Sequence, residues 1–183
     1  MKFVELVIPG VWVIDHGVFM DPRGRLERIV DEDEYRQRGI EVHLQHSLLS
    51  TNPESGTLRG FHYQVAPVPQ AKTFTCVSGA IHDVVVDLRL DSPTFLSWVA
   101  VELEVGGHQS LHVPRGCANA WMTKQNDTII HYGLSTAYAP DHQRGFRYDD
   151  PAFDVSWPSF PTVVGAQDLA WPGFDKNDNG LRF

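Results

Sequence analysis

The chain has 183 residues, of which 42% are hydrophobic and 21% charged, and its formal net charge is −8 at pH 7. That length suits one well-cored domain and is short for two. The composition is that of a soluble globular protein, and the negative balance argues against a nucleic-acid surface, which needs an excess of basic residues.

The two cysteines, Cys76 and Cys117, lie far apart among apolar residues and indicate buried thiols in a reducing compartment. Glu5 and Pro9 interrupt the N-terminal apolar run before a signal peptide forms. No stretch approaches the roughly 20 apolar residues of a membrane span. We therefore expect one domain over residues 1–183 that is cytoplasmic and binds neither nucleic acid nor membrane.

The first part of the chain predicts three short strands, at Val4–Ile8, Val11–Asp15 and Leu26–Val30. A turn rich in ligand-capable groups, Phe19–Arg25, precedes the third. Asp31 followed by Glu34 predicts a helix start, and Gly39 predicts its end about two turns later.

From residue 42 to residue 132 the pattern is that of short strands separated by turns rich in Pro, Gly, Asn and Ser. The predicted strands are Val42–Leu49, Thr57–Tyr63, Thr73–Val77, Ala80–Leu88, Trp98–Glu104, Ser110–Val113, Ala118–Met122 and Thr128–Tyr132. Many closely spaced strands without alternating helices predict an antiparallel sandwich or barrel. The C-terminal part predicts one short helical segment around Ala166–Leu169.

The stretch Gly56–Gln64, GTLRGFHYQ, alternates apolar and polar residues as a strand with one buried face does. Its polar members include Arg59 and His62, and Lys72 follows ten residues after the histidine. A strand that carries such groups predicts the lining of a pocket. His62 is the best candidate base, because an imidazole titrates near neutral pH. The alternative is a core histidine bonded to a backbone carbonyl, against which the neighbouring cations argue.

The nine histidines also suggest a metal site. Metal-dependent barrel enzymes commonly place two histidines two apart on a strand and a third after a Pro-x-Gly turn. Here those positions hold His62, Gln64 and Asn119, and amides are poor ligands for zinc or iron. We therefore expect neither a metal nor another cofactor.

The remaining candidates keep two interpretations each. Tyr132 ends an apolar strand and is either a core aromatic or a phenol that faces His62 and donates a proton. Tyr138 either stacks on a base or covers the barrel mouth. The cations that suit phosphate oxygens, unless they are simply solvated, are Arg23, Arg59, Lys72 and Arg115. The residues alone thus predict an acid–base pocket for an anionic ligand.

A set of short motifs runs in order along the chain. They are Phe19-x-Asp21-x-Arg23-Gly24, Gly56–Gln64, Ala71-Lys72, Asp83–Arg89, Ser92–Thr94, Pro114-x-Gly116-x-Ala118, Tyr138–Pro140, Arg144-Gly145 and Asp149–Pro151. Each is weak alone, but together and at these spacings they are specific. From Val11 to Phe174 the chain resembles the dTDP-4-dehydrorhamnose 3,5-epimerases, metal-free members of the cupin superfamily.

The resemblance implies an all-β fold, a cupin-type jelly-roll β-barrel with a few short peripheral helices. It implies a homodimer with sites shared across the interface. It also implies an epimerase without a cofactor, which inverts C3, C5 or both of a nucleotide-diphospho-4-keto-6-deoxy sugar through an enolate.

The resemblance also assigns residues. Its catalytic set is His62 as base, Asp168 as the residue that orients it, Tyr132 as the acid on the opposite face, and Lys72 at the enolate oxygen. Its substrate-binding set places Arg59 and Gln45 at the diphosphate and sugar. Phe19 and Arg23 of the neighbouring subunit, together with Tyr138, lie at the nucleoside. The set also includes Ser47, Asn119, Arg28 and Gln143.

Three positions depart from the usual pattern of that family. The family usually has histidine where this chain has Asn119, and an amide cannot shuttle protons, so inversion of one carbon or of two stays open. Members specific for thymidine often have glutamate at the position of Arg28, whose guanidinium only donates and would suit cytosine or guanine. A CDP- or GDP-linked substrate is therefore an alternative to a dTDP-linked one. Gln143 also stands where glutamate is common.

Three other functions are compatible with the same fold. A 3,4-ketoisomerase would move the carbonyl between C4 and C3, and the retained Lys72 and Tyr132 favour epimerisation over it. A non-catalytic sugar-nucleotide-binding cupin would have lost turnover, and the intact His62, Asp168 and Tyr132 argue against that. A metal-dependent cupin oxygenase is disfavoured by the two amides at ligand positions.

Overall fold

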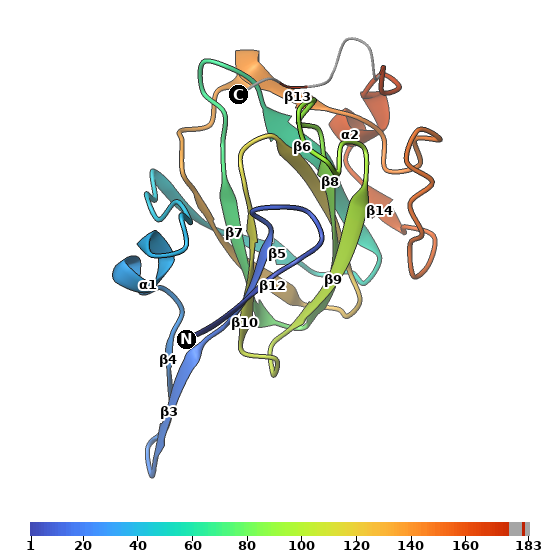
Figure 1. The fold of residues 1–183 in the computed structure, drawn as a ribbon. Coiled ribbons are helices and arrows are strands. Elements are labelled where there is room, and N and C mark those ends of the chain that lie inside the picture. Colours follow the sequence, from blue (N-terminus) through green and yellow to red (C-terminus); the bar gives the residue numbers. More distant parts are fainter. Residues whose placement is uncertain (176–180, 182–183) are drawn as a thin grey trace.

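The computed structural model describes residues 1–175 and residue 181. Its strands form two main sheets, and one hairpin projects from them (Figure 1). The first sheet contains, in spatial order, β1 (Lys2–Glu5), β2 (Trp12–Asp15), β10 (Gln109–Val113), β7 (Lys72–Ser78), β12 (Thr128–Leu134) and β5 (His46–Asn52). The second contains β13 (Gln143–Gly145), β6 (Thr57–Gln64), β11 (Cys117–Thr123), β8 (Ala80–Asp87) and β9 (Trp98–Glu104), and β14 (Val163–Val164) pairs with β6.

This arrangement confirms the predicted all-β jelly-roll barrel with short peripheral helices. Among the strands that the structure describes, every pairing is antiparallel except that of β14 with β6. The helices are α1 (Glu32–Arg36) and α2 (Ala166–Ala170), and a 3₁₀ turn, η1, covers Pro140–His142. Asp31 caps α1 as predicted, since its side chain accepts a hydrogen bond from Glu34 N at 3.2 Å. Within residues 1–175 and 181, no helix is long and apolar enough to span a bilayer.

Two hydrophobic clusters hold the sheets. The cluster between them contains Ile8, Val11, Phe74, Cys76, Ile81, Val85, Leu103, Leu111, Val113, Cys117, Trp121 and Ile130. A second cluster involves β6, β8 and β11, with Phe146 and Phe153 from the C-terminal part of the chain packed against them. Strand β8 therefore has apolar neighbours on both faces, which is why it reads as a nearly continuous apolar run. Both cysteines are buried and free, as predicted.

The N-terminal boundaries were predicted less well. Strand β1 ends at Glu5, and the predicted strand Val4–Ile8 is wrong beyond that point, because the chain turns and Leu6 N donates to Val11 O at 2.8 Å. The predicted turn at Phe19–Arg25 is a hairpin of two strands, β3 (Gly17–Asp21) and β4 (Gly24–Arg28). This hairpin is the projecting element of Figure 1, and its second strand replaces the one expected at Leu26–Val30.

The predicted strand Val42–Leu49 is also wrong at its start, since β5 begins at His46. Residues 41–44 lie outside the strands, and Leu44 packs on Gly133 of β12 so closely that a Cβ at that glycine would lie 2.3 Å from the leucine side chain. An apolar run predicts burial, but Leu44 is 46% exposed although it lies against a neighbouring strand.

Candidate active site

A cavity of about 400 Å³ lies between the two sheets. Strands β6 and β11 of the second sheet and β7 and β12 of the first line it, together with the segment around Tyr138 and with α2. The structure thus brings to one cavity most of the residues that the sequence singled out. They are Arg59, His62, Lys72, Asn119, Tyr132, Tyr138, Gln143 and Asp168.

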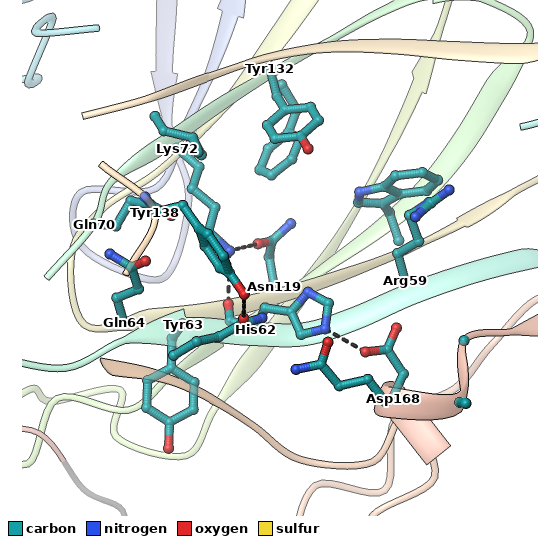
Figure 2. Close-up of a pocket in the computed structure, with 17 residues that line it drawn as sticks. Arg59, His62, Tyr63, Gln64, Gln70, Lys72, Asn119, Tyr132, Tyr138 and Asp168 are labelled. Atoms are coloured by element: carbon teal, nitrogen blue, oxygen red, sulfur yellow. Dashed lines mark hydrogen bonds and ion pairs between the residues drawn. The ribbon is translucent and has the colours of Figure 1, made fainter. Parts of the chain in front are cut away.

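His62 and Asp168 form a hydrogen-bonded pair on one wall (Figure 2). His62 Nε2 lies 2.5 Å from Asp168 Oδ1, and Gly60 N donates to Asp168 Oδ2 at 3.2 Å. Burial raises the pKa of the Asp168 carboxyl, but the hydrogen bond and charge of His62, with the Gly60 N–H, hold that pKa below its ordinary value. An ionised carboxylate can only accept, so His62 Nε2 donates to Asp168, and in the neutral ring Nδ1 is the nitrogen that carries the lone pair.

The position of Asp168 depends on how α2 is attached. Strand β14 pairs in parallel with the start of β6, and α2 follows directly after it. Arg147 Nη1 donates to Leu169 O at 3.0 Å, near the end of the helix. Trp171, the next residue after α2, lies on Gly145, which is the cross-strand partner of His62. The base and the carboxylate that orients it are therefore held by the same edge of the sheet.

Lys72 occupies the floor of the cavity between the two walls (Figure 2). Its Nζ donates to His62 O at 2.8 Å and to Asn119 Oδ1 at 2.9 Å. Burial lowers the pKa of the ammonium to about 8, against the opposing effect of the Asp83 charge. The lysine is therefore held in place as a cation whose protonation is sensitive to pH in the neutral to alkaline range.

Asp83 is a site residue that the sequence analysis missed. It is completely buried on β8, and both of its carboxylate oxygens lie 3.4 Å from Asn119 Nδ2. Burial raises its pKa to about 8, opposed by the Asn119 hydrogen bond and by the Lys72 charge. Asn119 thus bridges Lys72 and Asp83 with its two amide ends. In the sequence, the available indication of its role was an aspartate directly beside the apolar residues Val84–Val86 of a predicted strand, because such residues are seldom buried unless paired.

Tyr132 stands on the opposite wall from His62, on β12 (Figure 2). Its ring stacks on Phe74, with the two centroids 5.6 Å apart and the planes inclined by 26°. The side chain is only half-buried, so it is both part of the core packing and a member of the cavity lining. The two interpretations offered from the sequence are therefore compatible.

Three further side chains face the cavity. The guanidinium of Arg59 lies over the Trp121 ring at 5.8 Å, and its Nε donates to Asn52 Oδ1 at 3.0 Å. The Tyr138 hydroxyl donates to Gln143 Oε1 at 2.6 Å. A cation and an exposed aromatic at one cavity are groups that suit a phosphate and a flat ring.

Two predicted binding residues lie outside this cavity lining. Ser47 pairs with Gly133 across β5 and β12, and its hydroxyl bonds His131 Nε2 at 2.8 Å. Gln45 is exposed, and its backbone N–H donates to Leu134 O at 2.8 Å. Their roles in substrate binding stay predictions.

The two residues expected from a neighbouring subunit, Phe19 and Arg23, are on the projecting hairpin, as is the predicted binding residue Arg28. All three are exposed there. The Arg28 guanidinium lies 5.7 Å from the centroid of the Phe19 ring and bonds Asp31 at 3.0 Å, whereas Arg23 bonds Asp21. Within the described part of the chain, no group of three or more His, Cys, Asp or Glu side chains is placed to hold a metal ion.

The comparisons with known proteins agree with this geometry. The family model described as dTDP-4-dehydrorhamnose 3,5-epimerase matches residues 5–176. A protein of that name from Sinorhizobium fredii is 38% identical over 164 residues, covering 90% of this chain and 84% of the relative. A dTDP-4-dehydrorhamnose 3-epimerase from Streptomyces niveus is 31% identical, covering 92% and 81%. The crystal structure of the 3,5-epimerase from Bacillus anthracis, with TDP and PPi bound, superposes with a TM-score of 0.91 at 31% identity, covering 94% and 99%.

Proposed function

Since the chain belongs to the dTDP-4-dehydrorhamnose 3,5-epimerase family, we propose that its cavity binds a nucleotide-diphospho-4-keto-6-deoxy sugar and inverts C3, C5 or both. The observation that carries this proposal is the arrangement of three groups in one cavity. A base oriented by a carboxylate, His62 with Asp168, faces a phenol, Tyr132, and a buried ammonium, Lys72, lies between them. The mechanism expected from the sequence and the family of the chain therefore agree.

The first step is removal of a proton from carbon. The 4-ketone of the substrate acidifies the hydrogens on C3 and C5, because the resulting carbanion is delocalised as an enolate. His62 Nδ1 takes the proton and becomes an imidazolium, which the Asp168 carboxylate stabilises. The Lys72 ammonium stabilises the oxygen on which negative charge develops, so it favours the transition state over the substrate.

The second step returns a proton on the opposite face. Tyr132 donates its phenolic proton to the same carbon, the enolate becomes a ketone again, and the configuration at that carbon is inverted. One proton leaves the substrate and one is returned, so the substrate and product are isomers and no oxidant or cofactor is consumed. His62 then releases its proton and the Tyr132 phenolate takes one up, which restores the starting state.

The charge at Lys72 gives this reaction a testable pH dependence. Its pKa is lowered to about 8, so the ammonium is present below that pH and is lost above it. We expect kcat to fall as the pH rises through about 8, because the neutral amine no longer stabilises the enolate oxygen. The check is a profile of kcat against pH for the wild-type protein and for Lys72→Met. The variant should be much slower and lack this alkaline decline, and an identical decline in both proteins would assign it to another group.

Gly145 offers a test of how the catalytic pair is positioned. A Cβ at this glycine would lie 2.5 Å from Phe61 O and from the Trp171 ring, so Gly145→Ala must displace Trp171 and with it the end of α2. We expect kcat to fall on the order of 10- to 100-fold through misplacement of Asp168. Gly107→Ala, where the Cβ would meet nothing nearer than 3.4 Å, is the matched control. A Gly145→Ala protein with wild-type kcat would show that this packing does not position the carboxylate.

The nucleotide part of the substrate is proposed to lie at the other end of the cavity. Arg59 is the cation available to the diphosphate, and Tyr138 is the aromatic available to the base. The relative from Bacillus anthracis was solved with TDP bound, which supports a dTDP-linked sugar over the CDP and GDP alternatives. Thermal-shift measurements with dTDP, CDP, GDP and UDP test this, because the preferred ligand should raise the unfolding temperature most.

The hairpin of β3 and β4 is proposed to reach the cavity of a second copy of this chain. Its apolar side chains are exposed here, with Phe19 at 53%, Leu26 at 69% and Met20 at 73%. Mixing inactive Arg23→Ala and His62→Ala proteins is a direct test. If a site takes Arg23 from one copy and His62 from the other, mixed dimers contain one intact site and activity returns. Two proteins that stay inactive after exchange of subunits would show that the sites are not shared.

The reaction itself is tested with the substrate in deuterium oxide. We expect deuterium at C3, C5 or both, and a product with inverted configuration, without added metal or nicotinamide. NMR of the product also separates the alternatives. A 3-keto product would identify a ketoisomerase, and tight binding without exchange would identify a non-catalytic binding protein.

A further inference from the structure

Gln64 is buried at the edge of the cavity, and its side chain is fully engaged with backbone. It is the last residue of β6 and is only 3% exposed. Its Nε2 donates to Val68 O at 2.9 Å and to Ala137 O at 3.2 Å, and its Oε1 accepts from Ala139 N at 2.8 Å. Both amide hydrogens are therefore used, and although Gln64 lines the cavity it has no donor left for a ligand.

Two of these three hydrogen bonds flank a single residue, Tyr138. In an extended chain the C=O of one residue and the N–H of the second residue along point to the same side, which is how adjacent strands pair. The Gln64 carboxamide makes that pair of contacts with Ala137 and Ala139, so it takes the place of a peptide group from a neighbouring strand. It thereby fixes the backbone of Tyr138 from both sides.

The hydroxyl of Tyr138 is held by a residue that pairs with Gln64. Its hydroxyl donates to Gln143 Oε1 at 2.6 Å, and Gln143 on β13 is the cross-strand partner of Gln64. The tyrosine is 52% exposed, so core packing alone does not hold it. Instead, Gln64 holds its backbone, and Gln143, the cross-strand partner of Gln64, holds its hydroxyl. Figure 2 shows the Tyr138 ring at the cavity.

We propose that Gln64 is a positioning residue, which holds Tyr138 in the orientation in which it meets the nucleoside of the substrate. This rests on the proposed function, because the nucleotide is the ligand that Tyr138 is inferred to contact. A loop residue that is already ordered before binding loses less conformational entropy when the ligand arrives, so it binds more tightly. Gln64 supplies that order without touching the ligand.

The test is the Kd of dTDP, measured by calorimetry on the full chain. In Gln64→Met the hydrogen bonds are lost while the volume is kept, and we expect binding to weaken about 10-fold, since Tyr138 is then no longer held in place before the ligand arrives. The same substitution in a Tyr138→Ala background should weaken binding by less than about twofold, because the residue that Gln64 positions is already gone. Gln109→Met, which removes a glutamine bonded to Asp15 on the other sheet, is the matched control and should bind like the wild-type protein.

Gln64→Glu adds a readout that a merely structural role would not move. An ionised carboxylate keeps an acceptor for Ala139 N–H but repels Val68 O and Ala137 O, whereas the protonated acid can donate to one of them. Binding of dTDP by this variant should therefore improve as the pH is lowered, relative to the wild-type protein at the same pH. This variant also serves if Gln64→Met does not fold.

The outcomes separate the two levels of inference. Folded Gln64 variants that bind dTDP with the wild-type Kd, or that weaken binding equally with and without Tyr138, overturn the positioning role and leave the proposed function standing. A wild-type protein that binds none of dTDP, CDP, GDP and UDP overturns the proposed ligand and this inference with it.

Discussion

The His62→Ala protein is expected to lose deuterium exchange at the sugar carbons by about 10²- to 10⁴-fold, the usual contribution of a positioned general base. Of the described residues that line the cavity, His62 is the sole imidazole, and Asp168 is already committed to orienting it. The Lys72 ammonium donates to His62 O and Asn119 Oδ1 and offers no lone pair, so removal of this ring leaves the substrate proton without an acceptor. The rate of exchange, followed by NMR, is the measurement.

A matched control is available on the same barrel. His82 also bonds a carboxylate, with Nδ1 2.7 Å from Glu102 Oε1, but it is not part of the cavity lining. His82→Asn should therefore leave the exchange rate within about twofold of the wild-type rate. Exchange at the wild-type rate in His62→Ala would refute the assigned base, whatever the control does.

Tyr132→Phe is expected to separate exchange from inversion. His62 can still remove a proton and return one from solvent to the same face, so deuterium should enter the sugar. Delivery of a proton to the opposite face needs the phenol, so formation of the inverted product should fall by about 10²- to 10⁴-fold. The phenylalanine keeps the stacking on Phe74, so the fold should be little affected. Both rates are read from one NMR time course.

Tyr35→Phe is the control for loss of a tyrosine hydroxyl. Tyr35 is the buried residue of α1, away from the cavity lining, and its hydroxyl donates to Ile29 O at 3.1 Å. Its substitution should leave both rates unchanged, although it removes a buried hydrogen bond worth about 1 kcal/mol of stability. If Tyr132→Phe lost exchange and inversion in parallel, the phenol would be needed for proton removal and could not be the opposite-face acid.

The structure also gives a physical account of Asn119. Its Oδ1 accepts from the Lys72 ammonium and its Nδ2 faces the Asp83 carboxyl, so the side chain connects two buried titratable groups. An amide in this position can hold Lys72 but cannot carry a proton between Asp83 and a substrate. The product of the exchange experiment reports whether one carbon or two are inverted.

The strands between residues 57 and 134 could be predicted to within about two residues. In that region apolar residues alternate or run continuously, and Gly and Pro mark the turns, so local chemistry and tertiary burial favour the same structure. The predictions failed where apolar residues stay exposed. Leu44 lies against Gly133 of β12 without belonging to a strand, and the hairpin of β3 and β4 exposes an apolar surface that the same pattern would assign to a core.

By itself the sequence determined that Arg59 and His62 lie on one short strand, with Lys72 ten residues after His62. Residues three apart face opposite sides of a regular strand, and it is the register shift in the pairing of β6 with β11, between Asn119 and Trp121, that lets both line one cavity. Apart from Asp168, which the family resemblance assigned to His62, only the tertiary structure decided their partners. Asp168 is 106 residues away from His62 in sequence, and Asp83 and Gln64 took their roles from the neighbours that the sheet order brought to them. Pairing between distant strands depends on the whole hydrophobic pattern, so no local spacing encodes which carboxylate meets which base.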